Sequence, residues 1–297
     1  MKIFDFYNKE QTPFVLALGF FDSLHIGHCE IIANCKLLAK KLNASDVVFT
    51  FENDVASVFK KSSGLVYTFE ERLQKFKKLQ VDSLISTRFT KEFSQIEPLD
   101  FLKILINNFN VLGIVCGSDY TFGKDGEGTI STLVEFCKLN KIELQIINQV
   151  KMGEEKVSTS LIKEKLSLGK IEDANKLLGM PYFISGEVKK DRQVGRSLGF
   201  PTANVNLNSQ KLPIKLGVYK TFVEIDGKIY KCITNFGARP TFDLADVLTE
   251  TYIDGFCGDL YGKTLTIYFE SFLRDLIKFN SVDDLKLQLE KDLGAIR

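Results

Sequence analysis

Two histidines lie three residues apart in the segment GFFDSLHIGH, residues 19–28, and they are the only histidines of the chain. His25 and His28 flank Gly27, whose missing side chain lets the backbone approach a ligand closely. A buried-strand pattern precedes the segment and a helical pattern follows it, so a helix N-terminus suited to phosphate is expected here. Two imidazoles at that place could stabilise charge on a triphosphate under attack. A tight turn with two surface histidines fits the same letters, but the position after the first strand favours the phosphate site.

The segment GSDYTFGKDGEG, residues 117–128, also comes directly after a predicted strand. It is not a Walker A loop, because five residues separate Gly117 from Gly123 and Asp125 stands where serine or threonine is required. Taken alone it fits a surface loop. Its position at the carboxyl edge of a predicted sheet indicates a second wall of the same pocket.

Hydroxyl side chains precede a predicted helix in VSTSLIKEKL, residues 157–166. Ser158, Thr159 and Ser160 suit a helix cap. They suit a phosphate-binding site equally well, to which Lys163 would add a positive charge. The residues alone leave both interpretations open.

The segment GRSLGFPTAN, residues 195–204, combines glycines that allow a loop to wrap a phosphate with small polar side chains. Thr202 and Asn204 are two residues apart, so in an extended segment they share one face, and both offer hard oxygen ligands that suit Mg²⁺. Glu250, in the strand pattern LTETYID, is a candidate general base for an alcohol that attacks ATP. A turn with an exposed glutamate fits these residues nearly as well.

The first half of the chain alternates apolar strand patterns with amphipathic helix patterns. Strands are expected at 14–18, 46–51, 83–87, 111–117 and 142–148, and helices at 29–42, 70–79, 99–109 and 129–140. This alternation predicts an α/β domain with a doubly wound parallel sheet, whose ligand lies beyond the carboxyl ends of the strands.

The pattern changes after about residue 180. A helical connector is expected over 160–179, followed by short strands at 182–188, 217–226, 227–236, 247–254 and 263–269. The dipeptide Asp226-Gly227 indicates a hairpin, and the series predicts an antiparallel β-barrel. Ser281 and the acidic residues after it predict a closing helix over 281–293. The expected domains are 1–180 and 181–297.

The bulk properties are those of an ordinary globular protein. The chain has 297 residues, 44% of them hydrophobic and 26% charged, with a net charge of +1, which argues against a nucleic-acid footprint made by bulk charge. The six cysteines form no CxxC pair and indicate free thiols in a reducing compartment. Neither a signal peptide nor a membrane-spanning stretch is present, so a cytoplasmic protein without a membrane partner is expected. Its oligomeric state stays open.

Seven motifs in order give the chain a resemblance to the bacterial bifunctional riboflavin kinase / FAD synthetase family along nearly its whole length. GFFDSLHIGH resembles that family's GNFDGxHxGH, GSDYTFGKDGEG its GxDFxFGxxxxG, and VSTSLIK with LSLGKIEDANKLLGMPY its domain junction. GRSLGFPTAN, NFGARPTF, ETYIDGF, and DLYGKTLTIYF with FLRD resemble the kinase half. The resemblance implies ATP-dependent phosphorylation of riboflavin to FMN by the second domain, and adenylylation of FMN to FAD with release of pyrophosphate by the first.

The resemblance also assigns roles to individual residues. In the first domain, the ATP and phosphate contacts would be Gly19, Phe21, Asp22, His25, Gly27, His28, Asp119, Gly123, Ser158, Thr159, Ser160 and Lys163. In the second domain they would be Gly195, Arg196, Gly199 and Pro201, with Thr202 and Asn204 holding Mg²⁺. Glu250 would act as base for the ribityl hydroxyl, and Arg274 would help to close the site.

The departures from the family pattern lie in the first half. Phe20 stands for asparagine, Ser23 for glycine, and Leu161 and Lys163 for arginines. Lysine keeps the charge but loses the bidentate fork of arginine, so slower adenylyl transfer or a differently lined FMN pocket is expected. One alternative is a riboflavin kinase whose adenylyltransferase domain is impaired. Others are a flavin- or nucleotide-binding regulator without turnover, and a cytidylyltransferase of another HxGH family, which leaves the second domain unexplained.

Overall fold

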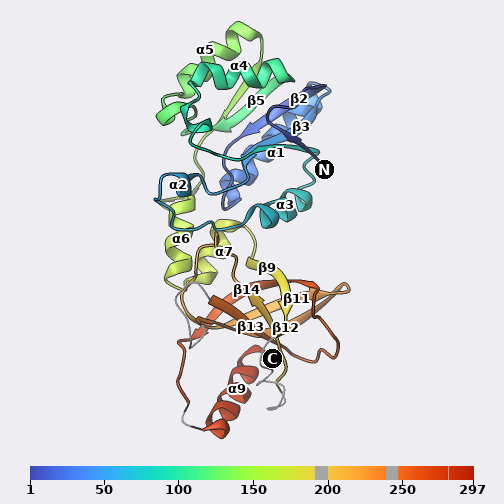
Figure 1. Cartoon of the computed structure of the whole chain (residues 1–297), viewed down its shortest axis with the longest axis vertical. Coiled ribbons are helices and arrows are strands. Elements are labelled where there is room, and N and C mark those ends of the chain that lie inside the picture. The colour runs from blue at the N-terminus through green and yellow to red at the C-terminus, as the bar shows by residue number, and fades with distance from the viewer. Residues whose placement is uncertain (191–199, 239–246, 280) are drawn as a thin grey trace. The chain divides into compact units, whose positions relative to one another are not determined.

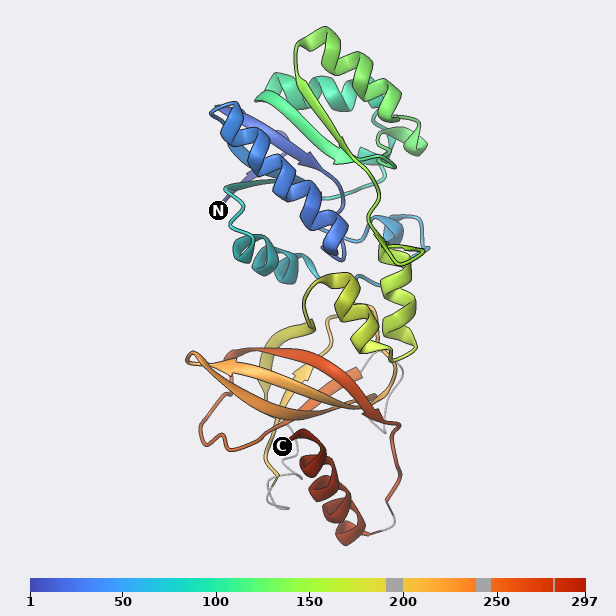
Figure 2. The same ribbon diagram turned by 180° about the vertical axis from the view of Figure 1, so that it is seen from behind.

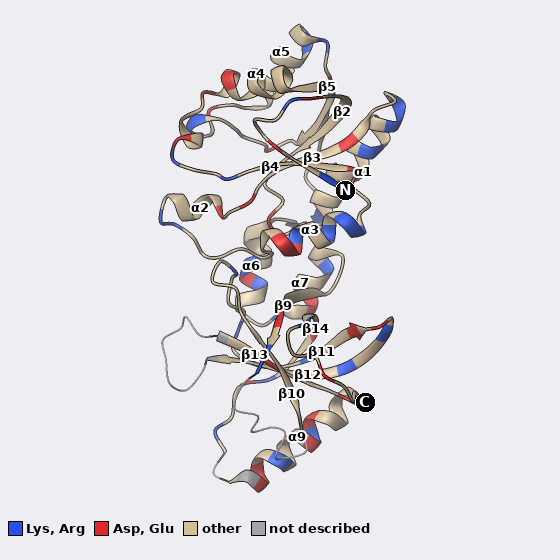
Figure 3. Ribbon diagram, turned by 45° about the vertical axis from the view of Figure 1, so that its right-hand side comes forward, with Lys and Arg blue, Asp and Glu red and all other residues tan. Residues whose placement is uncertain are grey.

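The computed structural model describes residues 1–190, 200–238, 247–279 and 281–297 (Figure 1). By its internal contacts the chain divides into two compact units, Met1–Thr159 and Ser160–Arg297. The boundary expected at residue 180 between the functional domains stays a prediction. Basic and acidic residues are interspersed within each unit and do not gather on one element (Figure 3).

The first unit contains a six-stranded parallel sheet in the order β1-β4-β3-β2-β5-β6. Its strands are β1 (Lys2–Asp5), β2 (Glu10–Leu18), β3 (Ser45–Phe51), β4 (Ser83–Thr87), β5 (Phe109–Gly117) and β6 (Glu143–Ile147). The central strands are nearly continuous apolar runs, as required where both faces of a parallel sheet are covered. From β2 the chain adds β3 and β4 on one side and β5 and β6 on the other, so the sheet has its switch point between β2 and β5.

Helices cover both faces of this sheet (Figures 1 and 2). The helices are α1 (Ile26–Lys41), α2 (Val55–Val58), α3 (Phe69–Lys78), α4 (Pro98–Asn108) and α5 (Ile130–Asn140), with the short turns η1 (Phe93–Gln95) and η2 (Lys124–Gly126). Successive residues of β2 alternate between the two faces. Val15 and Ala17 join one apolar cluster with residues of α1 and α3, and Leu16 and Leu18 join another with residues of α4 and α5. The doubly wound α/β fold is confirmed.

Several short elements of the first unit were not expected from sequence. They are β1, α2, the turns η1 and η2, and a hairpin of β7 (Lys151–Met152) and β8 (Glu155–Lys156). Elements of two to four residues carry too few side chains for a periodic pattern to emerge.

The second unit is a closed antiparallel barrel in the order β10-β13-β12-β11-β14-β9. Its strands are β9 (Tyr182–Lys189), β10 (Thr202–Asn206), β11 (Gly217–Ile225), β12 (Lys228–Ala238), β13 (Val247–Ile253) and β14 (Thr264–Arg274). The expected hairpin joins β11 to β12, with φ of 52° at Asp226 and 76° at Gly227. Helix α9 (Val282–Ile296) follows, and its cap Ser281 accepts a hydrogen bond from the Asp284 amide as expected.

The helical segment expected over 160–179 is two helices, α6 (Thr159–Ser167) and α7 (Ile171–Leu178). Gly169 separates them with a φ of +74°, and a Cβ at this position would come within 2.9 Å of the Lys215 side chain. A left-handed residue ends one helix and redirects the chain, which helical periodicity alone does not reveal.

The inner face of the barrel contains a chain of threonine hydroxyls. Thr221, Thr234 and Thr251 are fully buried, with oxygen–oxygen distances of 2.7 Å between the first two and 2.9 Å between the last two. Their neighbours in sequence point to the opposite face, because side chains alternate along a strand. Asn235 and Glu250 therefore lie on the outer face of the barrel.

Candidate active sites

A cavity of about 720 Å³ lies at the carboxyl ends of β2, β3, β5 and β6. Gly19 follows β2, Phe51 ends β3, and Asp119 follows β5. This is the edge at which the alternation of strands and helices predicted the ligand. Of the residues expected there, the cavity is lined by Gly19, Phe21, His25, Gly27, His28, Asp119, Gly123, Ser158 and Thr159.

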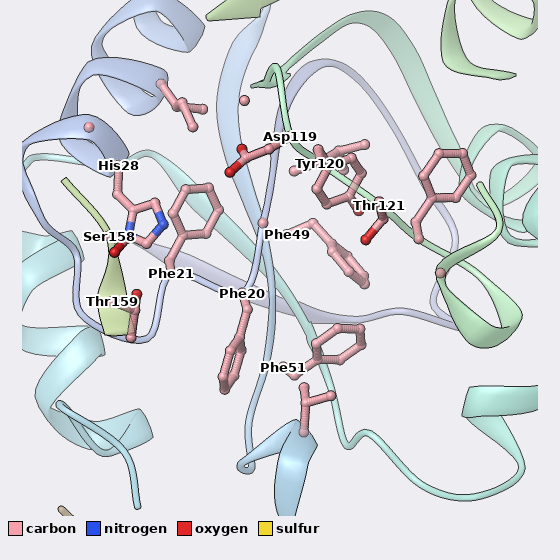
Figure 4. A pocket seen from close by; sticks show the side chains of 18 of the residues that line it. Phe20, Phe21, His28, Phe49, Phe51, Asp119, Tyr120, Thr121, Ser158 and Thr159 are labelled. Carbon is pink, nitrogen blue, oxygen red and sulfur yellow. The ribbon is translucent and has the colours of Figure 1, made fainter. Parts of the chain in front are cut away.

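The two histidines lie at the N-terminus of α1. His25 is its N-cap, and its Nδ1 accepts a hydrogen bond of 3.1 Å from the His28 amide. The two rings stack with centroids 3.7 Å apart, and the His28 ring meets the Phe21 ring edge to face. Figure 4 shows His28 beside Phe21, with Ser158 and Thr159 close by. Both histidines therefore line the cavity at the N-terminus of α1, where the helix dipole is positive.

Burial keeps both imidazoles neutral. It lowers the pKa of His25 to about 4, and the charges of Lys75 and Lys156 lower it while Asp119 raises it. Burial also lowers the pKa of His28 well below its ordinary value, with further lowering by His25 and Lys75. Because Nδ1 of His25 accepts a backbone N–H, we assign the proton of its neutral ring to Nε2. Near neutral pH His25 therefore acts as a hydrogen-bond donor rather than as a cation.

The loop between β2 and α1 contains two residues with left-handed backbone conformations. Phe21 and Leu24 have φ of 54° and 45°, a region that residues with side chains seldom adopt. The Phe21 ring covers Gly19 so closely that a Cβ there would come within 2.9 Å of it. Glycine at position 19 is thus required by the ring that packs against it.

Asp119 forms an ion pair of 3.0 Å with Lys156 at the rim of the cavity. Burial raises the pKa of the Asp119 carboxyl, but the hydrogen bond and charge of Lys156 outweigh it and the net pKa is lowered. The carboxylate is therefore ionised near neutral pH. The GSDYTFGKDGEG segment accordingly lines this cavity, as its position in the sequence indicated.

One end of the cavity is aromatic. The rings that line it include Phe20, Phe51, Phe89, Phe93, Tyr120 and Phe122. Figure 4 shows Phe20, Phe49, Phe51 and Tyr120 gathered away from His28. A flat aromatic ligand suits such a wall, while the polar end near the histidines suits phosphate.

Three of the residues expected at this site are not among those that line the cavity. Asp22 is buried, its Oδ1 accepts the Val66 amide at 2.8 Å, and it is not among the lining residues. Its carboxylate holds the loop before α3. Ser160 and Lys163 belong to α6 in the second unit, and their phosphate contacts stay predictions.

Ser23 stands where the family pattern has glycine. Its hydroxyl is 2.9 Å from that of Thr159, the first residue of α6. The fully buried Ser23 thus joins the histidine loop directly to the hydroxyl-rich segment 158–159. No sequence pattern indicated this contact, because the two residues are 136 positions apart.

The outer face of the barrel brings a second group of polar residues together. The register places Glu250 of β13 between Asn204 of β10 and Asn235 of β12. The Asn235 amide donates to the Glu250 carboxylate at 3.0 Å. Glu250, Asn235 and Thr202 line a cavity of about 310 Å³ with residues of α9. Sequence reasoning found Glu250 and missed Asn235, whose role depends on the cross-strand register.

Arg274 lines the same cavity at the end of β14. Its guanidinium forms an ion pair with Asp292 of α9, at 2.7 Å from Nη2 to the carboxylate, and its Nε donates to both carboxylate oxygens at 3.1 Å. Gln288 donates to the same carboxylate at 2.7 Å. Arg274 therefore attaches α9 to the barrel at the edge of the Glu250 cavity.

Thr202 and Asn204 line a neighbouring cavity of about 540 Å³, together with Pro201. The Asn204 side-chain oxygen is buried and has no hydrogen-bond partner among the described residues. An orphaned buried oxygen beside a threonine hydroxyl fits a hard cation such as Mg²⁺. In the described part of the chain no group of three acidic, histidine or cysteine side chains suits a metal. Gly195, Arg196 and Gly199 lie outside the described residues.

These features define a two-domain chain in which a nucleotidyltransferase-like α/β unit precedes a β-barrel unit. A family model for FAD synthetase matches residues 7–161, and one for riboflavin kinase matches residues 178–297. The chain belongs to the family of bifunctional riboflavin kinases/FMN adenylyltransferases. Both enzyme domains expected from the motifs are thus confirmed, and the kinase-only alternative is not favoured.

Curated relatives carry the name bifunctional riboflavin kinase/FMN adenylyltransferase. The one from Listeria monocytogenes is 35% identical over 94% of this chain and 90% of its own, and the one from Bacillus subtilis is 33% identical over 96% and 92%. A solved structure named a macrolide-efflux protein from Streptococcus pneumoniae matches with a TM-score of 0.89 and 30% identity, over 100% of this chain and 99% of its own. Its name differs from theirs, while its fold agrees along the whole chain. Among the described residues, no helix has the length and apolar character to cross a membrane.

Proposed function

We propose that each unit carries one of the two reactions at the cavity described above. FMN adenylylation takes place at the carboxyl edge of the parallel sheet, and riboflavin phosphorylation takes place on the outer face of the barrel. The observation that supports this division is that His25 and His28 line a cavity in the first unit, whereas Glu250 lines one in the second.

In the first cavity, a phosphate oxygen of FMN attacks the α-phosphorus of ATP, and the bond to the β-phosphate breaks to release pyrophosphate. Neutral His25 donates its Nε2–H to the phosphate oxygens, and the N-terminus of α1 adds its dipole. The aromatic end of the cavity takes the flavin ring. The site works by positioning the two substrates and by hydrogen-bond donation to the phosphates.

In the second site, the terminal ribityl hydroxyl attacks the γ-phosphorus of ATP, and ADP leaves. Glu250 accepts the proton of that hydroxyl, and Asn235 fixes the orientation of the carboxylate through the hydrogen bond of 3.0 Å. Thr202 and Asn204 would hold Mg²⁺, which neutralises phosphate charge when bound. Arg274 positions α9 beside the site through Asp292.

The setting proposed for the enzyme is a reducing, cytoplasmic one. All six cysteines are free thiols, and burial raises the pKa of Cys35, Cys116 and Cys232 to about 12. Such thiols are unreactive core residues. ATP, riboflavin, FMN and FAD are the proposed small-molecule partners.

The test is a time course with purified protein, riboflavin, ATP and Mg²⁺, with flavins separated by chromatography. FMN that appears first and then gives way to FAD supports both reactions on one chain. FMN that accumulates without FAD would contradict the role proposed for the first cavity. It would support a riboflavin kinase whose adenylyltransferase domain is impaired.

A further inference from the structure

A buried lysine lies behind the histidine loop. Lys75 of α3 is 3% exposed, although it belongs to a helix that otherwise carries its lysines on the surface. Its Nζ donates to the carbonyl oxygens of Ser23 at 3.3 Å and of Leu24 at 3.1 Å. It also lies 4.4 Å from the centroid of the Tyr67 ring. An ammonium group is expensive to bury, so these acceptors and the aromatic face are what make its position tenable.

Arg72 acts on the same loop from one turn earlier on α3. It is fully buried, and its guanidinium donates to the Phe20 carbonyl at 3.1 Å and to the Phe51 carbonyl at 2.7 Å. Together the two side chains bind three carbonyl groups of the segment that joins β2 to α1. Since that segment contains two left-handed residues, its shape depends on such contacts from outside.

The charge of Lys75 reaches the histidines. It lowers the pKa of both His25 and His28, in addition to the lowering by burial. The other charged groups that act on His25 are Asp119, which raises its pKa, and Lys156, which lowers it. The positive charge of Lys75 disfavours protonation of the imidazoles. For the same reason it favours a negatively charged group in the cavity that they line.

We propose that Lys75 is a positioning residue of the adenylyl-transfer site, which fixes the histidine loop by its carbonyls and places a buried positive charge behind it for the polyphosphate of ATP. This inference rests on the function proposed for the first cavity. It assigns Lys75 no contact with the substrate. Its effect is on the affinity for ATP and on the pH at which the histidines remain neutral.

The test compares Lys75→Met with Lys77→Met in the full chain. Lys77 lies on the same helix and is exposed, so its variant controls for loss of a lysine from α3. For Lys75→Met, KM for ATP in FAD formation should rise about tenfold, because the buried charge behind the polyphosphate and the hydrogen bonds that fix the histidine loop are lost, while KM for FMN changes little. The acid limb of the pH profile should move upward by about half a unit or more, because a positive charge near the histidines has gone. Lys77→Met should behave as the unsubstituted chain.

Two further measurements separate this role from a purely structural one. Riboflavin phosphorylation by the same molecules should be unchanged in Lys75→Met. A Lys75→Arg variant, which keeps the charge, should recover much of the affinity for ATP. Equal damage by methionine and arginine, or equal rises in both KM values with an unmoved acid limb, would overturn the inference. If instead a His25/His28 double variant keeps full FAD formation, the function proposed for the cavity fails, whatever Lys75→Met does.

Discussion

The two units of this chain assemble their polar site residues in different ways. In the first, the two histidines come from one short segment at a helix N-terminus, and burial leaves both of them neutral. In the second, Asn204, Glu250 and Asn235 come from three strands and meet because of the barrel register. The histidine pair is therefore local in sequence and depends on its surroundings for its protonation state, whereas the group around Glu250 depends on the barrel register for its assembly.

This difference predicts which step of each reaction a substitution should affect. A change at the first site acts on hydrogen-bond donation and on the field in the cavity. A change at the second acts on proton acceptance and on how α9 is held by Arg274 and Asp292. Because the two reactions are assayed on one molecule, each serves as the control for the other.

The largest effect is expected at Glu250. Glu250→Gln keeps an acceptor for the Asn235 amide but removes the base, so FMN formation should fall by about a thousandfold. Conversion of supplied FMN to FAD should be unaffected. Glu270→Gln on β14, whose carboxylate pairs with Lys220, is the matched control. Loss of both reactions in a folded Glu250→Gln protein would break the division into two sites.

The reverse pattern is expected for the histidines. In a His25→Ala, His28→Ala double variant, FAD formation should fall by about a hundredfold or more, because the His25 donor to the phosphates and the His28 ring stacked on it are lost. FMN formation from riboflavin should continue at its usual rate. Chromatography of the flavins over time measures both. FAD formation at the unsubstituted rate would contradict the function proposed for this cavity.

The buried histidine also predicts a pH effect on stability. An unfolded histidine binds a proton below pH 6.5, whereas His25 in the folded chain binds one only near pH 4. Between these values the unfolded state holds the extra proton, so stability falls as the pH falls. At pH 5 the loss should be on the order of 2 kcal/mol relative to pH 7. Urea unfolding of the chain and of His25→Gln at both pH values measures it, and an equal pH dependence in the two proteins would contradict it.

The smallest effect is expected for the contact between Ser23 and Thr159. Their hydroxyls are 2.9 Å apart, and a neutral hydrogen bond of this kind contributes about 1 kcal/mol. A double-mutant cycle of Ser23→Ala and Thr159→Ala, read from the rate of FAD formation, should give a coupling of that size. Strictly additive effects would mean that this replacement of the family's glycine does not join the two segments.

Much of the fold was predictable because long elements carry periodic patterns. The strand at 83–87 was predicted with the bounds of β4, and the hairpin at Asp226-Gly227 with its two strands. The break between α6 and α7 was not predicted, since it depends on one left-handed glycine. The family and both activities were also predicted, because seven motifs in order are specific where each alone is weak.

What the sequence determined by itself was the local chemistry: a histidine pair at the start of a helix, hydroxyls before another, and a carboxylate in a strand. Only the tertiary structure decided which of these groups face a cavity and in what state. The neutrality of His25 follows from burial, and the partnership of Glu250 with Asn235 from register. The sequence of helix α3 is rich in charged residues, and its periodicity did not reveal that the Arg72 and Lys75 side chains are buried. They are buried because carbonyl oxygens far away in sequence accept their hydrogen bonds, and such contacts form only in the folded chain.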